Sequence, residues 1–307
     1  MRILRSLRGC RGRVGTVVTL GNFDGVHRGH RRILSQVVRR AHALGARSVV
    51  VTFDPHTRQV VGKERGFHCL STPSEKVRLL SGVGIDTAVF LRFGATLQRM
   101  GAAAFLEKVL LLGLRPREIV FGLDHRFGSG RTGDFSLLAG QCRKLGVRVS
   151  RVRPCRLQGA PVSSTRIRER MAKGDLAAAV RLLGGPYLVC GKVVKGFALG
   201  RRLGFPTANL QVPPEKLLMP DGVYAGHAVL GARRYRALVS LGNRPTFKGT
   251  QRVLEAHLLG YEGTLYGKEL CLEIRAFVRP QKRLAGPVAL AAHIRKDIDA
   301  IKRIIKN

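Results

Sequence analysis

The stretch TVVTLGNFDGVHRGH, residues 16–30, sets the fold of the first part of the chain. Residues 16–20 form a short β-branched run typical of a buried strand, and apolar residues keep helical spacing over residues 33–44. The segment between them therefore predicts a strand that turns directly into a helix. The free N–H groups at such a helix start favour negative charge. Three glycines let the backbone pass close to a ligand there: Gly21, Gly25 and Gly29.

Two histidines close this turn. His27 and His30 lie one helical step apart, so both imidazoles can face a phosphate bound at the helix start. Taken alone, His27 could simply cap the turn and His30 could be a surface residue. Because both follow the GNFDG loop, residues 21–25, we favour a phosphate site with imidazoles built into it.

The composition is that of a globular protein with room for two domains. The chain has 307 residues, of which 45% are hydrophobic, so it can bury sizeable cores and is too apolar to be disordered. No apolar run approaches the roughly 20 residues needed to cross a bilayer, and we expect no membrane partner. The first thirteen residues hold five arginines and no acid. Because a strand follows almost at once, we interpret them as a short basic lead-in of a cytoplasmic protein rather than as a transit peptide.

The six cysteines are scattered along the chain. They form no CxxC pair and no close His/Cys cluster, which argues against a zinc site and against a disulfide framework. We therefore expect reduced thiols at all six positions: Cys10, Cys69, Cys142, Cys155, Cys190 and Cys271.

The charge is strongly positive. With 55 Lys and Arg against 19 Asp and Glu, the formal net charge is +36, which favours polyanionic partners such as RNA. The basic residues are nevertheless spread along the whole chain, with no RGG tract, no basic heptads and little aromatic interleaving. We therefore interpret them as the arginine-rich surface of an enzyme with anionic ligands. This interpretation predicts non-specific adhesion to RNA but no specific nucleic-acid partner.

Strand and helix patterns alternate up to about residue 152. Helical patterns separate the strand-like runs, one announced by a capping box at residues 72–75 and one that Asp134 could cap. This alternation predicts a Rossmann-like α/β domain, with a doubly wound parallel sheet that binds ligands at the carboxyl ends of its strands. The chain contains no GxGxxG, which removes the main support for a dinucleotide cofactor. The strand-like runs after the first one lie at residues 47–53, 87–91, 118–121 and 147–152.

The pattern changes after two short helices that we predict within residues 163–183, the second capped by Asp175. Gly184-Gly185-Pro186 breaks the helical pattern, so we predict two domains, residues 1–185 and 186–307. The short β segments that follow predict an antiparallel β-barrel. They lie at residues 187–194, 222–230, 235–241, 253–259 and 269–278. A final amphipathic helix is expected to pack across the barrel with one apolar face, made of Leu290, Ile294, Ile298, Ile301 and Ile305.

The segment GNFDGVHRGH resembles the GxFDGxHxGH signature of the HxGH nucleotidyltransferases, in particular of the bacterial bifunctional riboflavin kinase/FAD synthetase family. Further segments fit that family in order. TFDPH, residues 52–56, precedes Thr57, where the family usually has Pro. FGLDHRFGSGRTGD, residues 121–134, keeps Asp124 but has His125 in place of the usual Phe. VSSTRIR, residues 162–168, looks like the family's SSTxIR.

The resemblance implies that the first domain adenylylates FMN with ATP, giving FAD and pyrophosphate. The 5′-phosphate of FMN would attack the α-phosphorus of ATP in line, while His27 and His30 donate to the developing charge and Mg²⁺ screens the leaving group. Without the family, residues 163–168 would be a common helix N-cap followed by a solvated arginine. The residues that the resemblance assigns to ATP and phosphate are Gly21, Asn22, Phe23, Asp24, Gly25, Asp124, Ser163, Ser164, Thr165 and Arg168.

The second domain resembles riboflavin kinases. GKVVKGFALGRRLGFPTANL, residues 191–210, is similar to GxVxxGxxxGRxLGFPTAN, and LEAHLL, residues 254–259, places Glu255 where that family has its catalytic base. The resemblance implies phosphorylation of riboflavin to FMN, with Glu255 accepting the 5′-hydroxyl proton and Thr207 and Asn209 holding Mg²⁺. Without the family, Glu255 would be a barrel-facing carboxylate paired with an arginine. The glycines that would approach the ATP phosphates are Gly196, Gly200 and Gly204.

Because the resemblance covers essentially the whole chain, we predict a bifunctional enzyme that takes riboflavin, FMN and ATP and releases FAD. One alternative is an HxGH adenylyltransferase for a pantetheine or nicotinamide nucleotide, but it leaves the PTAN segment, residues 206–209, without a purpose. Another is a basic RNA-binding protein on this scaffold, which rests only on the charge. The sequence does not indicate the oligomeric state.

Overall fold

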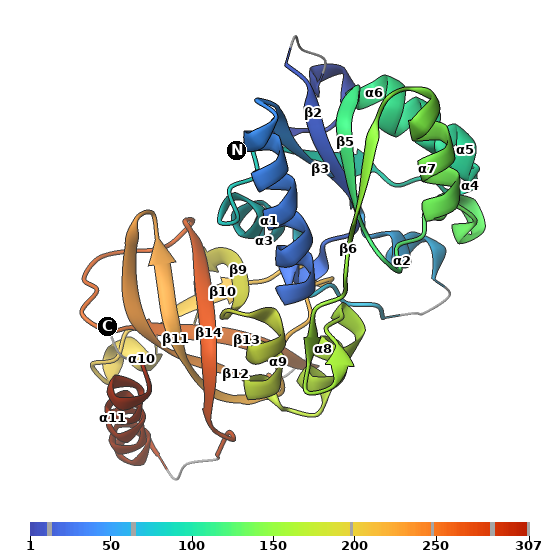
Figure 1. Cartoon of the computed structure of the whole chain (residues 1–307). Helices are drawn as coiled ribbons and strands as arrows, with labels where there is room; N and C mark the ends of the chain where they lie inside the picture. The colour runs from blue at the N-terminus through green and yellow to red at the C-terminus, as the bar shows by residue number, and fades with distance from the viewer. Residues whose placement is uncertain (11–13, 63–65, 197–198, 247–248, 283–285, 306–307) are drawn as a thin grey trace. The chain divides into compact units, whose positions relative to one another are not determined.

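The computed structural model describes residues 1–10, 14–62, 66–196, 199–246, 249–282 and 286–305, so Phe197 and Ala198 of the glycine-rich segment lie outside the described residues. The chain divides into two compact units, Met1–Cys69 with Lys76–Ser164 and Leu70–Glu75 with Thr165–Asn307. The first contains a parallel sheet and the second a closed antiparallel barrel (Figure 1). The predicted fold class, an α/β domain followed by a β-barrel, is confirmed.

The main sheet of the first unit has six strands that all pair in parallel, in the order β1-β4-β3-β2-β5-β6. The order reverses at β2, between β3 and β5, which creates a crevice at the carboxyl ends of these strands. The strands are β1 (Arg2–Leu4), β2 (Thr16–Leu20), β3 (Arg47–Asp54), β4 (Thr87–Arg92), β5 (Pro116–Gly122) and β6 (Arg148–Val152), followed by the two-residue strands β7 (Arg156–Leu157) and β8 (Ala160–Pro161).

Helices cover this sheet on both faces. Val18 and Val49 pack in an apolar cluster with Leu138 of α7, whereas their neighbours Val17 and Val50 pack in a second cluster with α1. Burial on both faces is typical of a parallel sheet. The helices are α1 (Arg28–Ala43), α2 (Thr57–Val61), α3 (Pro73–Ser81), α4 (Ala95–Arg99), α5 (Ala102–Phe105), a π-helical stretch (Leu106–Leu111), α6 (Leu112–Leu114) and α7 (Phe135–Lys144), with short 3-10 turns at Leu7–Cys10, Asp24–Val26 and Ser129–Arg131.

The basic lead-in is part of the sheet. β1 pairs in parallel with β4, from Arg2 opposite Thr87 to Leu4 opposite Val89, and Cys10 is buried in the same cluster as Val18. The interpretation of residues 1–13 as a lead-in ahead of the first strand was therefore wrong for the described residues 1–10. A three-residue edge strand is too short to show a period of two in the sequence.

The two predicted short helices are α8 (Ser164–Ala172) and α9 (Leu176–Leu183). Asp175 caps α9, because its Oδ1 accepts a hydrogen bond of 2.9 Å from the N–H of Ala178. From Thr165 onward both helices belong to the compact unit of the barrel. The predicted domain boundary between residues 185 and 186 stays a prediction.

The barrel closes in the order β10-β13-β12-β11-β14-β9, and all its strand pairs are antiparallel. Strand β10 was not predicted, because the PTAN segment reads as a Gly/Pro turn. The elements are β9 (Tyr187–Val194), α10 (Leu199–Arg202), β10 (Ala208–Gln211), β11 (Gly222–Leu230), β12 (Arg233–Thr246), β13 (Gly249–Leu258), β14 (Glu269–Arg279) and α11 (Pro287–Ile304).

Helix α11 packs on the barrel as predicted. Ile301 and Ile305 are buried against Val223, Ala225 and Leu238, with Ile294 and Ile298 partly buried beside them. The ion pair between Arg279 of β14 and Asp297 of α11, with a distance of 2.7 Å between Nη2 and Oδ2, fixes the helix to the barrel wall. No described helix is long and apolar enough to cross a membrane.

A buried ion pair holds residues 70–75 within the second unit. Nζ of Lys216 lies 2.7 Å from Oε2 of Glu75, and both side chains are fully buried. Lys216 also donates to the carbonyl oxygens of Leu70 (2.7 Å) and Leu188 (2.5 Å), so all three ammonium protons have acceptors. Glu75 also completes the predicted capping box, because its carboxylate accepts from the N–H of Thr72 at 2.9 Å and its own N–H donates to Oγ1 of Thr72 at 3.3 Å.

The structure contradicts the expectation that all six thiols are reduced. Cys190 of β9 and Cys271 of β14 form a disulfide with a Cα–Cα distance of 4.1 Å. Antiparallel pairing places these two residues directly opposite each other. The two cysteines are 81 residues apart in the sequence, so their spacing did not predict that they lie close together. The other four cysteines are free thiols.

We predict that Lys216→Met lowers the free energy of unfolding by about 3–5 kcal/mol, because it leaves the Glu75 carboxylate buried without its cation. Urea denaturation followed by circular dichroism measures the effect. Lys302→Met is the matched control, because Lys302 is largely exposed. Equal stability of the two variants would contradict the structural weight given to this pair.

Candidate functional site

The turn after β2 is held in an unusual backbone conformation. Phe23 (φ 45°), Gly25 (φ 76°) and Val26 (φ 38°) all adopt left-handed φ values, which are uncommon for non-glycine residues such as Phe23 and Val26. Phe23, Asp24 and Val26 are nevertheless buried, so packing holds the conformation. The turn delivers the chain into α1 at the sheet crevice, as the sequence predicts.

His27 and His30 lie face to face at the start of α1. Their rings stack with centroids 3.6 Å apart and planes 18° from parallel. Nδ1 of His27 accepts a hydrogen bond of 3.3 Å from the N–H of His30, so His27 is also the N-cap of α1. Capping the turn and presenting an imidazole to a ligand are therefore compatible roles for His27.

His30 is neutral at physiological pH. Burial first, and then the nearby charges of His27, Lys76, His125 and His56, hold the pKa of its imidazole well below its usual range. Its Nδ1 is buried and has no hydrogen-bond partner among the described residues. A buried, unpartnered ring nitrogen is a candidate for contact with a ligand.

The GNFDG loop contacts residues far along the chain. Oγ of Ser164 donates to the carbonyl oxygen of Asp24 at 3.0 Å, which joins the first half of the SSTxIR-like segment to the loop. A side chain at Gly29 would press on the His27 ring and on the carbonyl oxygen of Val162. The glycine between the histidines therefore permits this close approach.

Thr57, one of the two departures from the family pattern, has a defined role. Nδ2 of Asn22 donates to Oγ1 of Thr57 at 2.9 Å, and Oδ1 of Asn22 accepts from the N–H of Thr57 at 3.4 Å. A proline could supply neither the hydroxyl nor the N–H. The substitution thus orients the Asn22 amide.

A large cavity, with an empty volume of about 1310 Å³ that includes open solvent, lies beside this loop. Gly21, Asn22 and Thr57 lie along it, and four phenylalanines and three arginines contribute to its wall. Flat apolar surfaces with a few charged groups suit an aromatic ligand that carries an anion. The phenylalanines are Phe53, Phe93, Phe105 and Phe127, and the arginines are Arg58, Arg126 and Arg131.

His125, the second departure, also lines this cavity. Burial and the charge of Arg131 lower the pKa of its imidazole to about 4, so the ring is uncharged near pH 7. It contacts Phe121 edge to face, with centroids 4.6 Å apart. Its ring nitrogens make no hydrogen bond to the described residues.

Not every predicted residue of the first site lies at the cavity. Asp124 is exposed and does not line it. Thr165 is exposed, and both Thr165 and Arg168 belong to the compact unit of the barrel. Ser163 is half-buried next to Ser164. The roles of these residues stay predictions.

In the barrel unit, two of the predicted glycines are places of close approach. A side chain at Gly196 would overlap the Asn209 amide, and one at Gly200 would overlap the carbonyl oxygen of Phe205 and press on Thr207. Gly204 has a left-handed φ of 83°. Gly196 and Gly200 therefore each lie close to one of the two residues expected to hold Mg²⁺.

Strand register places Glu255 beside Asn209, one of the two residues expected to hold Mg²⁺. Asn209 of β10 pairs directly with Glu255 of β13, and Glu255 lines a cavity together with Gly200 and Thr207. The empty volume of this cavity is about 670 Å³, open solvent included. A carboxylate, a hydroxyl and an amide oxygen so arranged are hard oxygen donors of the kind that Mg²⁺ takes. The residues present therefore fit such an ion.

Two further residues escaped the sequence reasoning. His257 lines the same cavity as Glu255, and its Nδ1 lies 2.8 Å from the carbonyl oxygen of Pro206. Its place two residues after Glu255 is a signal, because such residues share one face of a strand. Lys76 is buried in the first unit and bonds to Thr52, whose hydroxyl donates to Asn22 of the GNFDG loop; no signal in the sequence pointed to it.

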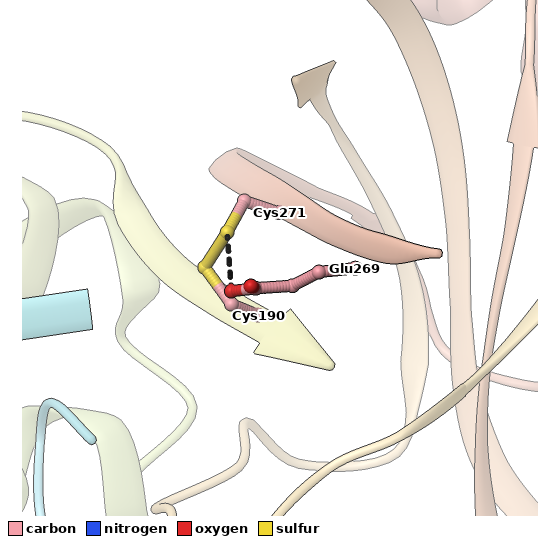
Figure 2. A group of neighbouring side chains, drawn as sticks. All are labelled: Cys190, Glu269 and Cys271. Carbon is pink, nitrogen blue, oxygen red and sulfur yellow. Dashed lines mark hydrogen bonds between the residues drawn. A yellow bond between two sulfur atoms is a disulfide. The ribbon is translucent and has the colours of Figure 1, made fainter. Parts of the chain in front are cut away.

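Cys190, Glu269 and Cys271 also approach one another, with potential ligand atoms within 4.8 Å (Figure 2). Oε1 of Glu269 lies 4.0 Å from Sγ of Cys271. A disulfide sulfur carries no proton, so we regard this approach as a contact rather than a hydrogen bond. Because both sulfurs are bonded to each other, the group offers only a carboxylate to a metal ion.

Comparison with known proteins identifies both units. A family model described as FAD synthetase matches residues 11–166, and one described as riboflavin kinase matches residues 183–305. A protein of Pseudomonas fluorescens named bifunctional riboflavin kinase/FMN adenylyltransferase is 35% identical over 99% of this chain and 98% of its own length. The chain belongs to this bifunctional family. The expected family is thus confirmed.

Other relatives agree. A protein of the same name from Escherichia coli K12 is 35% identical over 92% of this chain and 90% of its own length, and one from Listeria monocytogenes is 32% identical over the same shares. A crystal structure from Streptococcus pneumoniae described as a macrolide-efflux protein has a TM-score of 0.83 and 26% identity, covering 98% of both chains. The two-unit architecture is therefore shared along the whole length.

We predict that acid destabilises the adenylyltransferase unit through its buried imidazoles. Because the pKa values of His30 and His125 are lowered in the folded state, the unfolded chain binds more protons below pH 6.5, and the free energy of unfolding falls as pH falls toward about 4. At pH 5 the His125 contribution is on the order of 2 kcal/mol.

Melting temperatures of the parent and of His125→Phe at pH 7 and pH 5 measure this effect. The variant should lose less stability on acidification. His42→Phe, at an exposed position of α1, should lose as much as the parent. An equal loss in all three proteins would refute the assignment to His125.

Proposed function

We propose that the first unit makes FAD from FMN and ATP at the GNFDGVHRGH turn, and that the barrel unit makes FMN from riboflavin and ATP beside Glu255. The family establishes the two activities, and residue roles are our inference. The observation that carries the first role is the stacked pair His27 and His30 at the sheet crevice, with a buried ring nitrogen of His30 left without a partner.

The cavity beside Asn22 suits the flavin ring of FMN. Its phenylalanines offer flat apolar surface for a tricyclic ring, and its arginines offer charge for the phosphate. His125, neutral and without a hydrogen bond from the protein, can donate or accept at the polar edge of that ring. The departure from phenylalanine would thus exchange an apolar contact for a polar one.

Adenylyl transfer at this turn needs positioning and charge stabilisation rather than a covalent intermediate. The N–H groups at the start of α1 and the imidazoles of His27 and His30 would donate to the α-phosphate oxygens as negative charge develops there. The neutral state of His30 suits a hydrogen-bond donor that does not release its proton. Mg²⁺ bound to ATP would supply charge for the leaving pyrophosphate.

In the barrel unit Glu255 would accept the proton of the riboflavin 5′-hydroxyl as that oxygen attacks the γ-phosphate of ATP. Its register opposite Asn209 supports this role, because the base then lies beside the residues that would hold Mg²⁺. Thr207 and Asn209 would bind the ion through neutral oxygens, and ATP would bring the negative charge. His257 would keep Pro206, and with it the PTAN segment, in place.

The expectations on partners and location stay predictions. A cytoplasmic location agrees with two reactions that consume ATP, and the high positive charge agrees with substrates that are anions. No observation favours a specific nucleic acid over these ligands.

We predict that His27→Ala with His30→Ala abolishes FAD formation from FMN and leaves riboflavin phosphorylation nearly intact. Losing one donor to transition-state charge can cost on the order of a hundredfold in rate. Chromatographic assay of FMN and FAD, with riboflavin or FMN as substrate and ATP with Mg²⁺, separates the two half-reactions. FAD formation at the parent rate would disprove the role at the α-phosphate.

We predict that Glu255→Gln has the opposite effect on the two half-reactions. A general base contributes about 10²–10⁴ in rate, and Gln keeps the shape of the side chain while losing its basicity. Conversion of riboflavin to FMN should therefore stop while conversion of FMN to FAD continues. Glu262→Gln, at an exposed position in the same unit, is the matched control. A stable Glu255→Gln protein with normal kinase activity would exclude Glu255 as the base.

A further inference from the structure

The ammonium group of Lys76 is buried, and few groups around it offset its positive charge. Its side chain is 4% exposed, and among the described residues its Nζ donates a single hydrogen bond, of 3.3 Å to Oγ1 of Thr52. The ring of Phe90 lies 5.9 Å away, measured to its centroid. Among the described residues no carboxylate comes within ion-pair distance of this ammonium. Burying such a charge is costly unless something compensates it.

Lys216, the second buried lysine among the described residues, has a full set of partners for its charge. Lys216 is 3% exposed, and its Nζ has the carboxylate of Glu75 and two carbonyl oxygens within 2.7 Å. The ammonium group of Lys216, which has a structural role, therefore has an acceptor for each of its three protons. Lys76 has one neutral hydroxyl in place of these three acceptors.

The surroundings of Lys76 belong to the adenylyltransferase site. Oγ1 of Thr52, which accepts from Nζ, itself donates to the carbonyl oxygen of Asn22 in the GNFDG loop at 3.1 Å. Asp24 and Asp54 act on the ammonium from a longer distance, and burial outweighs them, so the pKa of Lys76 is lowered. The charge of Lys76 in turn acts on His30.

We propose that Lys76 is the buried counter-charge of the phosphate site, left incomplete in the free enzyme and completed when the phosphates of the substrate or of pyrophosphate bind over the GNFDGVHRGH turn. It is a positioning residue, because it acts through Thr52 and the loop and through its field at His30. This inference rests on the proposed role of the turn.

On this proposal, the buried charge of Lys76 destabilises the free protein and stabilises the complex with phosphate. Lys76→Met removes the charge and keeps an unbranched side chain that is one atom shorter. Oγ1 of Thr52 still donates to Asn22, so the variant orphans no donor. The free variant should melt at the same temperature as the parent or above it, whereas Lys216→Met should melt lower.

The binding test uses inorganic pyrophosphate with Mg²⁺, measured by calorimetry on the full-length protein. The His27→Ala, His30→Ala protein serves as reference, because the binding that it loses defines the site at the turn. Lys76→Met should bind pyrophosphate at that site at least about tenfold more weakly than the parent. Its rate of FAD formation should fall as well, while its riboflavin kinase rate stays unchanged.

The outcomes separate the two proposals. If the parent and the histidine variant bind pyrophosphate equally, the phosphate site at the turn is wrong. If the histidine variant loses binding but Lys76→Met binds within about twofold of the parent, Lys76 is not its counter-charge. A Lys76→Met protein that melts well below the parent, or does not fold, would also overturn the proposal, because a merely structural lysine predicts that result.

Discussion

The place of β2 between two parallel neighbours is the constraint on which the adenylyltransferase unit depends. Strands β3 and β5 pair with β2 on its two sides. The chain therefore leaves the sheet at the carboxyl edge, directly after Leu20. The left-handed turn at Phe23 and Gly25 follows from the need to enter α1 within a few residues. The stacked histidines and the close approach of Gly29 to Val162 both lie at this change of direction.

Much of this fold could be read from periodicity. Strands buried on both faces and the amphipathic α11 leave strong patterns, and the caps at Asp134 and Asp175 are local signals that the structure reproduces. Strands β1 and β10 escaped because they have three and four residues. Their pairing with β4, β9 and β13 defines them, and pairing between distant segments is not visible in local sequence.

The residues of the candidate sites also divide into those that local sequence predicts and those that only the fold brings together. The GNFDGVHRGH turn and the PTAN segment are continuous in sequence, so their chemistry could be predicted. Lys76, His257 and the Cys190–Cys271 pair depend on which elements the topology brings together. For the cysteines, composition and spacing pointed to free thiols, and only the register of β9 against β14 places them face to face.

The two departures from the family pattern, Thr57 and His125, both lie on the wall of one cavity, whereas the turn beside it keeps every signature residue. A methyl group at Gly29 would press on His27 and Val162, whereas the cavity wall carries a hydroxyl and an imidazole at the two departures. Under the proposed function, these two substitutions change the cavity that would hold the flavin and leave unchanged the turn at which adenylyl transfer would occur. An engineer who seeks an enzyme for modified flavins would begin with these two positions and leave the turn alone.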